Sequence, residues 1–150
     1  MINWNTKTFT QLTTLELYEL LKLRVDVFVV EQTCPYPELD NHDQVNGVHH
    51  LMGYDGDTLV ACARLLPKGT TYDYVSIGRV ATKASHRGGG LGHDLIVQAK
   101  LECQRLWPNE TIKIGAQSHL QKYYSRHGFE ACSEEYMEDD IPHIDMKLLK

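Results

Sequence analysis

The sequence has no long hydrophobic run and no recognisable leader. Its most apolar stretch, around residues 25–30, is too short to span a membrane and contains Asp26. The first five residues lack the basic and then apolar pattern of a secretory signal. We therefore expect neither a membrane association nor export.

Paired cysteines and an excess of positive charge are also missing. The chain has four scattered cysteines, namely Cys34, Cys62, Cys103 and Cys132. The absence of a C-x-x-C pair argues against a zinc ribbon or a redox motif and favours reduced thiols in the cytoplasm. His49, His50 and Asp43 match no zinc-ligand spacing, so no metal is expected. The net charge of −5 argues against a nucleic acid partner.

The remaining composition is that of an ordinary globular domain. Of the 150 residues, 42% are hydrophobic and 23% are charged. A chain of this length buries roughly two-thirds of its unfolded surface, which is enough for a core. We predict one domain over residues 1–150, with no linker or internal repeat.

The first half of the chain alternates between strand and helix patterns. Residues 2–9 read as a first strand. A helix follows, capped by Thr13 or Thr14 with Glu16 in its first turn, and it ends near Gln32. Strands over 48–54, 58–66 and 74–82 then form an antiparallel meander whose first turn is Asp55-Gly56-Asp57.

Two features of this half have two readings each. Arg24 falls on the apolar stripe of the helix, so it either extends its charge to solvent or pairs with a buried acid near a site. The loop over 34–43 is acidic and aromatic, and it is either a solvated surface loop or one wall of a substrate pocket.

The second half is organised around a strand, a glycine loop and a helix. Strand 76–82 is followed by Arg87-Gly88-Gly89-Gly90-Leu91-Gly92, after which apolar residues recur with helical period to Leu106. Glycines allow close backbone approach, and the N–H groups of a first helical turn attract anions. This stretch predicts a site for a phosphorylated small molecule.

The elements after this helix complete the sheet. A strand over 111–116 makes a crossover whose two strands are parallel. Ser118 is a candidate cap for a helix through Arg126, closed by His127-Gly128. Strands over 129–136 and 144–149 end the chain, and the acidic segment 134–140 between them is expected to be exposed.

Two common phosphate motifs are not met. The dinucleotide fingerprint fails because His93 stands where a glycine is required, and no Gly-Lys-Ser/Thr follows the loop. The remaining Arg-x-x-Gly-x-Gly pattern resembles the pyrophosphate loop of GNAT N-acetyltransferases, and Tyr123–Phe129 resembles the family's Tyr-x-x-x-Gly-Phe segment. Segments 23–32, 40–43, 114–121 and 141–146 resemble the ElaA-like subfamily.

This resemblance implies an α/β fold. The family has a mixed, mostly antiparallel sheet, splayed at a central parallel pair, with helices on both faces. It uses acetyl-CoA as co-substrate and transfers the acetyl group directly to an amine. The resemblance places the thioester at Val80, Ala81 and Thr82, and the pyrophosphate at Arg87, Gly88, Gly89, Gly90, Leu91 and Gly92.

The resemblance also suggests catalytic residues. Tyr124 matches the tyrosine that protonates the departing thiolate. Glu31 is our first choice of general base, and Asp40, Asp43, His119 and His143 are alternatives. We place the acceptor near these residues, and the predicted contacts are Arg24, Asp40, Asp43, Gln117, His119 and His143.

The acceptor itself is not specified. The acidic segments 38–43 and 134–140 favour a cationic amine, either a small molecule or a peptide. A non-catalytic CoA-binding regulatory module and a nucleotide-binding α/β module are the competing functions. The last strand could also pair with a second copy, which leaves a homodimer open.

Overall fold

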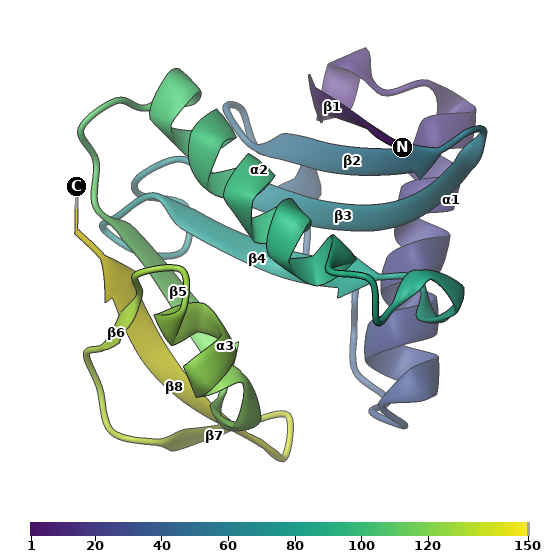
Figure 1. Cartoon of the computed structure of the whole chain (residues 1–150). Helices are drawn as coiled ribbons and strands as arrows, with labels where there is room; N and C mark the ends of the chain where they lie inside the picture. Colours follow the sequence, from purple (N-terminus) through teal and green to yellow (C-terminus); the bar gives the residue numbers. More distant parts are fainter. Residues whose placement is uncertain (150) are drawn as a thin grey trace.

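The first half of the molecule is an antiparallel sheet. The computed structural model describes residues 1–149, and its first sheet has the order β1-β2-β3-β4 (Figure 1). Its strands are β1 (Ile2–Thr8), β2 (His49–Asp55), β3 (Thr58–Leu66) and β4 (Ser76–Thr82). The predicted meander is thus confirmed, and the β2–β3 turn contains Gly56 at φ +61°.

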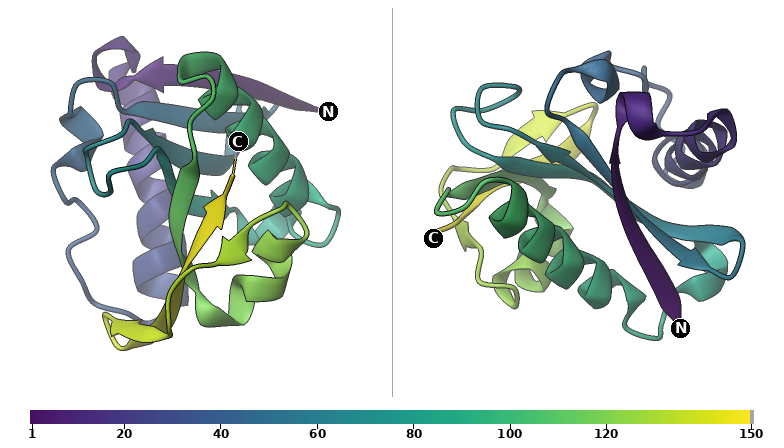
Figure 2. Two further views of the ribbon diagram at one scale, coloured as in Figure 1. Left: turned by 90° about the vertical axis from the view of Figure 1, so that its left-hand side faces the viewer. Right: turned by 90° about the horizontal axis from the view of Figure 1, so that it is seen from above.

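Two helices cover opposite faces of this sheet, as the view from above shows (Figure 2). They are α1 (Thr14–Val25) and α2 (Leu91–Leu106). Strand β3 is buried on both faces because Ala63 and Leu65 pack in the cluster that contains α2, whereas Cys62 packs in the cluster that contains α1. A strand between two apolar layers therefore carries a near-continuous apolar sequence.

Helix α1 begins where the sequence predicts and continues into a wider turn. The Glu16 N–H donates to Thr13 Oγ1 over 3.1 Å, and the Thr13 N–H donates to Glu16 Oε1 over 2.9 Å. After Val25 the chain forms a π-helical turn, η2 (Asp26–Glu31), with the Gln32 N–H bonded to the Val27 carbonyl. The predicted end near Gln32 is confirmed. Turns of this kind are frequent at functional sites.

The second half forms a separate sheet that diverges from the first. Strands β5 (Ile112–Gln117), β8 (Ile141–Leu148) and β6 (Glu130–Ala131) lie in that order, and β7 (Tyr136–Glu138) also pairs with β8. Strands β4 and β5 meet only through a parallel bridge between Val75 and Ile112. Beyond this bridge the two strands separate, as predicted for a splayed parallel pair.

The C-terminal strands differ from their predicted bounds. The strand predicted over 129–136 is interrupted, and only Glu130–Ala131 and Tyr136–Glu138 pair with β8. Strand β8 begins at Ile141 rather than at 144. Strands β7 and β8 form a hairpin. Its turn is made by the acidic residues Asp139 and Asp140, at φ +50° and +63°. Sequence patterning missed β7 because its three residues, Tyr136, Met137 and Glu138, are too few to show an alternating pattern.

Short turns complete the chain. They are η1 (Phe9–Gln11), η3 (His42–Gln44), η4 (Ala84–His86) and η5 (Ser118–Leu120), and η5 leads into α3 (Gln121–Ser125). The predicted cap at Ser118 is wrong: Gln117 precedes η5, Leu120 precedes α3, and Ser118 Oγ is buried with no hydrogen-bond partner among the described residues. The predicted glycine at the helix end is confirmed, since Gly128 has φ +92°.

Candidate functional site

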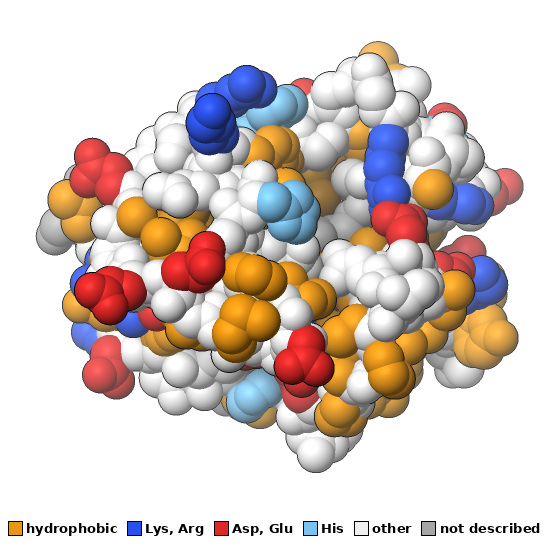
Figure 3. Space-filling model, turned by 90° about the horizontal axis from the view of Figure 1, so that it is seen from below, with side chains coloured by type: hydrophobic (Ala, Val, Ile, Leu, Met, Phe, Trp, Pro, Cys, Tyr) orange, Lys and Arg blue, Asp and Glu red, His pale blue; other side chains and the backbone are white. Residues whose placement is uncertain are grey.

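A cavity of about 800 Å³ occupies the space between the diverging strands β4 and β5. Residues 76–80 of β4 form one wall, residues 114–117 of β5 form another, and the 34–42 loop and the β7–β8 turn close it. Seen from below, the surface is hollowed near its middle, with acidic, hydrophobic and histidine side chains around the hollow (Figure 3). A chamber bounded by the two sheets is a natural place for ligand binding.

The cavity collects most, but not all, of the side chains predicted for the site. The predicted residues that line it are Glu31, Asp40, Val80, Thr82, Arg87, Gln117, His119, Tyr124 and His143. Ala81 and residues 88–92 are absent from its wall, and so are the buried charged residues Arg24 and Asp43. The predicted substrate role of these two residues therefore lacks direct contact with the cavity.

A β-bulge interrupts β4 at the cavity wall. Ala81 pairs with Cys62 and Gly78 pairs with Arg64, so Arg79 and Val80 both face Ala63 alone. Arg79 has φ +48°, in the left-handed region. A bulge frees a backbone N–H from the ladder and turns it toward the open side of the strand. This is the geometry expected for a strand that binds a carbonyl oxygen.

The glycine loop lies at the end of β4 and begins α2. Gly88 and Gly90 have φ +92° and +86°, which side-chain-bearing residues rarely adopt, and Gly90 immediately precedes the first helical residue, Leu91. A Cβ added at Gly88, Gly89 or Gly90 would meet nothing within 4 Å. The glycines are thus required by backbone conformation, and the space around them is open to a ligand.

Arg87 is folded back toward β4. Its Nη2 donates to the Thr82 carbonyl over 2.7 Å, and its Nη1 donates to Glu31 Oε2 over 2.6 Å. The predicted base Glu31 therefore lies on the side of the cavity next to the glycine loop. In this structure the Glu31 carboxylate holds the Arg87 side chain in place, and its role as base stays a prediction.

Tyr124 and Tyr123 point to different partners. Tyr124 is 8% exposed and lines the cavity, and among residues 1–149 its hydroxyl makes no hydrogen bond. Burial raises the pKa of Tyr124, so the phenol keeps its proton at neutral pH. Tyr123 instead donates its hydroxyl hydrogen to the Gly92 carbonyl. Of the two, Tyr124 is therefore the tyrosine whose hydroxyl has no partner among the described residues, and its role as acid stays a prediction.

Six alternating charges form a closed ring beside the cavity, and three of them, Asp40, Arg64 and Arg79, line it. Each arginine bonds two acids and each acid bonds two arginines, at distances between 2.7 and 3.4 Å. In order, the members are Arg24, Glu38, Arg79, Asp40, Arg64 and Asp43, and the ring then returns to Arg24. We call this set the ion ring.

The ion ring joins the 34–43 loop to three elements. Arg24 comes from α1, Arg64 from β3 and Arg79 from β4, whereas the three acids all come from the loop or from η3 beside it. Tyr36 adds a 2.5 Å hydrogen bond to Glu38. The loop is therefore a fixed wall of the cavity, and the buried-pair reading of Arg24 is confirmed.

The ring also decides which acids can accept a proton. Burial alone would raise the pKa of Asp40, but the hydrogen bonds and charge of Arg64 outweigh it and hold the pKa well below its usual range. The pKa of Asp43 is lowered in the same way by Arg24 and Arg64. Both acids are therefore poor general bases at neutral pH.

Sequence reasoning did not assign a role to Glu38, Arg64 or Arg79. One signal was present: each arginine of the ring stands within an otherwise apolar stretch, where a buried charge requires a partner. The identity of the partners depends on the path of the loop, which the sequence pattern does not give.

His143, Gln117 and His119 lie on the cavity wall opposite β4. His143 is 9% exposed, and its Nδ1 lies 2.7 Å from the Ile141 carbonyl, so Nδ1 carries the hydrogen. Its Nε2 lies 3.4 Å from Glu138 Oε2. Gln117 donates to Gln32 Oε1 over 3.2 Å, which connects β5 to the end of η2. His119 is exposed.

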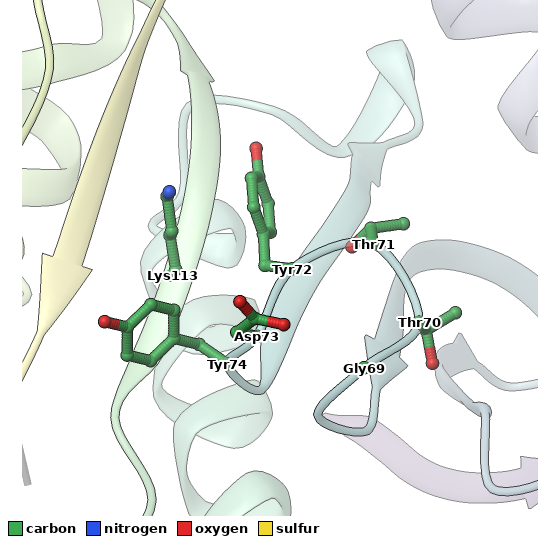
Figure 4. Close-up of a pocket in the computed structure, with 7 residues that line it drawn as sticks. All are labelled: Gly69, Thr70, Thr71, Tyr72, Asp73, Tyr74 and Lys113. Atoms are coloured by element: carbon green, nitrogen blue, oxygen red, sulfur yellow. The ribbon is translucent and has the colours of Figure 1, made fainter.

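A smaller hollow of about 340 Å³ lies where residues 69–74 pass over β5. The side chains of Tyr72 and Lys113 lie side by side there (Figure 4), with the ammonium 4.6 Å from the ring centroid. Lys113 Nζ is also 3.6 Å from Asp145 Oδ2. Its charge is already matched, so this hollow offers no ready anion site.

Among residues 1–149, no group of three or more His, Cys, Asp or Glu side chains could hold a metal ion.

Comparison with known proteins agrees with this geometry. The profile described as Acetyltransferase (GNAT) domain matches residues 24–150. The chain is 41% identical to Protein ElaA of Escherichia coli (strain K12) over 146 residues, which cover 97% of this chain and 95% of that protein. No helix within residues 1–149 is long and apolar enough to cross a membrane.

Solved structures give the same result. The crystal structure of an acyl-CoA N-acyltransferase from Pseudomonas aeruginosa matches with a TM-score of 0.94 and 47% identity, covering 99% of each chain. That of Escherichia coli ElaA matches with a TM-score of 0.93 and 40% identity over the same shares. The chain therefore belongs to the GNAT family of acyl-CoA N-acyltransferases, within its ElaA-like group.

Proposed function

We propose that this chain is a single-domain, cytoplasmic N-acetyltransferase that moves the acetyl group of acetyl-CoA directly onto a primary amine. The observation that carries this proposal is the cavity between β4 and β5, which brings the β4 bulge and Tyr124 together and opens beside the glycine loop. The donor would enter along the loop and β4. The amine would enter between the 34–42 loop and the β7–β8 turn.

The donor residues follow from backbone geometry. The N–H groups of Gly88 to Gly92 at the start of α2 would hold the pyrophosphate, where unpaired amides and the helix dipole favour an anion. The Arg87 side chain would also bind the pyrophosphate, after its contact with Glu31 breaks. The backbone of Val80, Ala81 and Thr82 would pair with the pantetheine arm, and a free N–H of the bulge would bind the thioester carbonyl oxygen.

The transfer breaks one bond and forms another. The neutral amine attacks the thioester carbonyl, the C–S bond breaks, and the new amide keeps the acetyl group. Tyr124, which burial keeps protonated, donates its phenolic proton to the departing thiolate to give the CoA thiol. The proton that the amine nitrogen loses passes to a base, and the phenolate regains a proton before the next turnover. A cysteine carrier is not needed: burial raises the pKa of Cys62 to about 12, so its thiolate is not available.

The acceptor is an amine that arrives as a cation. Glu138 and Asp139 are exposed at the mouth of the cavity, and neither is a member of the neutral ion ring. Their charge attracts an ammonium group, which must then lose a proton before it can attack. His143 joins Glu31 as a candidate proton acceptor, because its Nδ1 hydrogen is bound to a carbonyl and its Nε2 faces Glu138.

A thermal-shift screen separates this function from its competitors. Acetyl-CoA and CoA should stabilise the chain by about 2.7 kcal/mol at a concentration 100-fold above the Kd, whereas ATP and NAD should not. CoA release with a panel of primary amines then tests transfer. Stabilisation by CoA without transfer to any amine would indicate a non-catalytic CoA-binding module. Stabilisation by ATP or NAD alone would indicate a nucleotide-binding module.

The matched variants are Tyr124→Phe and Tyr18→Phe. Tyr18 is 69% exposed on α1, so its variant controls for the loss of a phenol. We expect Tyr124→Phe to lower kcat by roughly 10²- to 10⁴-fold with little change in CoA affinity. Equal turnover in Tyr124→Phe and Tyr18→Phe would remove Tyr124 from the role of acid.

A further inference from the structure

Arg79 has a backbone conformation that its side chain does not favour. Its φ of +48° is in the left-handed region, where a non-glycine residue costs of the order of 1 kcal/mol. Glycine would adopt this conformation without strain, and Gly78 immediately precedes it. The presence of arginine at the strained position indicates that its side chain has a use there.

The side chain leaves the bulge toward the acceptor loop. Its Nε donates to Glu38 Oε2 over 2.8 Å, and its Nη2 lies 3.4 Å from Asp40 Oδ2. The guanidinium carbon lies 6.0 Å from the ring centroid of Phe28 and 5.8 Å from that of Tyr36. Two carboxylates and two aromatic rings therefore hold one guanidinium in place.

Arg79 differs from the other arginines of the ion ring. Arg24 and Arg64 are 1% and 4% exposed and bind the acids from below, on α1 and β3. Arg64 also lines the cavity, but the Arg79 side chain is 24% exposed and belongs to the bulge itself. It is thus the member of the ring that connects the acceptor-side loop to the strand expected to hold the thioester.

The Arg79 backbone is held as well. Cys62 Sγ on β3 donates to the Arg79 carbonyl over 3.6 Å, and Cys62 is fully buried. Val80 shares the bulge with Arg79, and the next residue, Ala81, returns to the ladder, where it pairs with Cys62. Rotation of the bulge would therefore require both this contact and the two ion pairs of Arg79 to break.

We propose that Arg79 is a positioning residue for acyl transfer, which fixes the β4 bulge against the acceptor loop through the ion ring. This inference rests on the proposed function, since it assumes that the bulge binds the thioester. The side chain supplies no proton, and it takes no part in the proposed pyrophosphate site at residues 87–92. Its loss should therefore lower the rate of transfer much more than the affinity for the donor.

Three substitutions of Arg79 separate the side chain from the backbone strain. Arg79→Ala removes the ion pairs and keeps the unfavourable φ. Arg79→Gly removes both, and Arg79→Lys keeps the charge without the planar fork. The matched control is Arg105→Ala, because Arg105 is 59% exposed on α2 and pairs only with Glu102.

The first measurement is steady-state transfer from acetyl-CoA. Arg79→Ala and Arg79→Gly should lower kcat by roughly 10- to 100-fold, as expected for a misplaced reacting group. The KM for acetyl-CoA should change by less than about threefold, and Arg79→Lys should recover part of kcat. Wild-type kcat in Arg79→Gly, or equal losses in kcat and donor affinity, would overturn the proposal.

The second measurement does not depend on activity. Hydrogen exchange of the segment 76–83 should accelerate in Arg79→Ala and stay unchanged in Arg105→Ala, while exchange in α2 stays constant. Unchanged exchange of 76–83 in Arg79→Ala overturns the proposal. If the wild-type chain transfers no acetyl group, the proposed function fails, and this exchange still decides whether Arg79 fixes the bulge.

Discussion

Replacing Arg24 by methionine should destabilise the fold more than any surface change. Arg24 is 1% exposed and donates to Glu38 Oε2 and to Asp43 Oδ1, both over 2.7 Å. Methionine fills a similar volume but donates no hydrogen bond. The ion ring would then hold three carboxylates against two guanidinium groups, with the uncompensated charge among side chains that water barely reaches.

The magnitude follows from this geometry. Removing one partner of a buried ion pair costs about 3–5 kcal/mol, because the desolvated partner remains. For a chain of this size, 1 kcal/mol shifts the Tm by about 2–4 °C, so Arg24→Met should melt roughly 6–20 °C lower. The loss should shrink on mild acidification, since Arg24 helps to lower the pKa of Asp43 and this carboxyl takes up a proton more readily once Arg24 is gone.

Urea unfolding at pH 7 measures this difference directly. The control is Arg105→Met, whose parent residue pairs with a single acid on the surface and should contribute less than about 1 kcal/mol. The double variant Arg24→Met with Asp43→Asn should recover part of the stability, because the ring is again neutral. A loss below about 1 kcal/mol in Arg24→Met would refute the buried ring.

Three further predictions follow from single contacts. Glu31→Gln should lower the Kd for CoA roughly two- to fivefold by calorimetry, because Glu31 no longer competes with the pyrophosphate for Arg87. A 100-fold fall in kcat at constant Kd would instead identify Glu31 as the base. Thermal stability should fall below about pH 4, because the pKa of Asp40 is lower in the folded chain than in the unfolded chain. The stability that ionised Asp40 contributes is present above the unfolded pKa and is lost as the pH falls toward the folded pKa. Asp40→Asn should flatten the dependence of Tm on pH, and an equally steep dependence would contradict this reasoning. Thr13→Ala should lower the free energy of unfolding in urea by about 1 kcal/mol, because it removes the α1 cap. Ser118→Ala should be neutral or stabilising, because it removes a buried hydroxyl that has no partner among residues 1–149. A comparable loss in Ser118→Ala would show that Ser118 caps a helix.

Local signals predicted the elements that depend on near neighbours. The cap at Thr13, the turn at Gly56 and the loop at Gly88–Gly92 each depend on residues within a few positions of one another. Alternating and helical hydrophobic patterns then assigned β1 to β5 and both long helices. These predictions hold because backbone propensity and burial act in the same direction there.

Local signals failed where distant contacts decide the outcome. Ser118 has the chemistry of a cap, but its hydroxyl is buried and has no partner among residues 1–149. The three-residue β7 is too short to show a strand pattern, and its pairing with β8 makes it a strand. Propensity is outweighed in both cases by the path of the chain.

The sequence by itself predicted the donor side that we propose. Glycines at positive φ, followed at once by a helix N-terminus, predict an anion site within six residues, and Tyr124 follows in a segment with its own pattern. Tertiary structure alone decided the arrangement of the proposed acceptor side. The ion ring draws its arginines from α1, β3 and β4 and its acids from one loop, and only folding brings charges so far apart in the chain within 3.4 Å of one another.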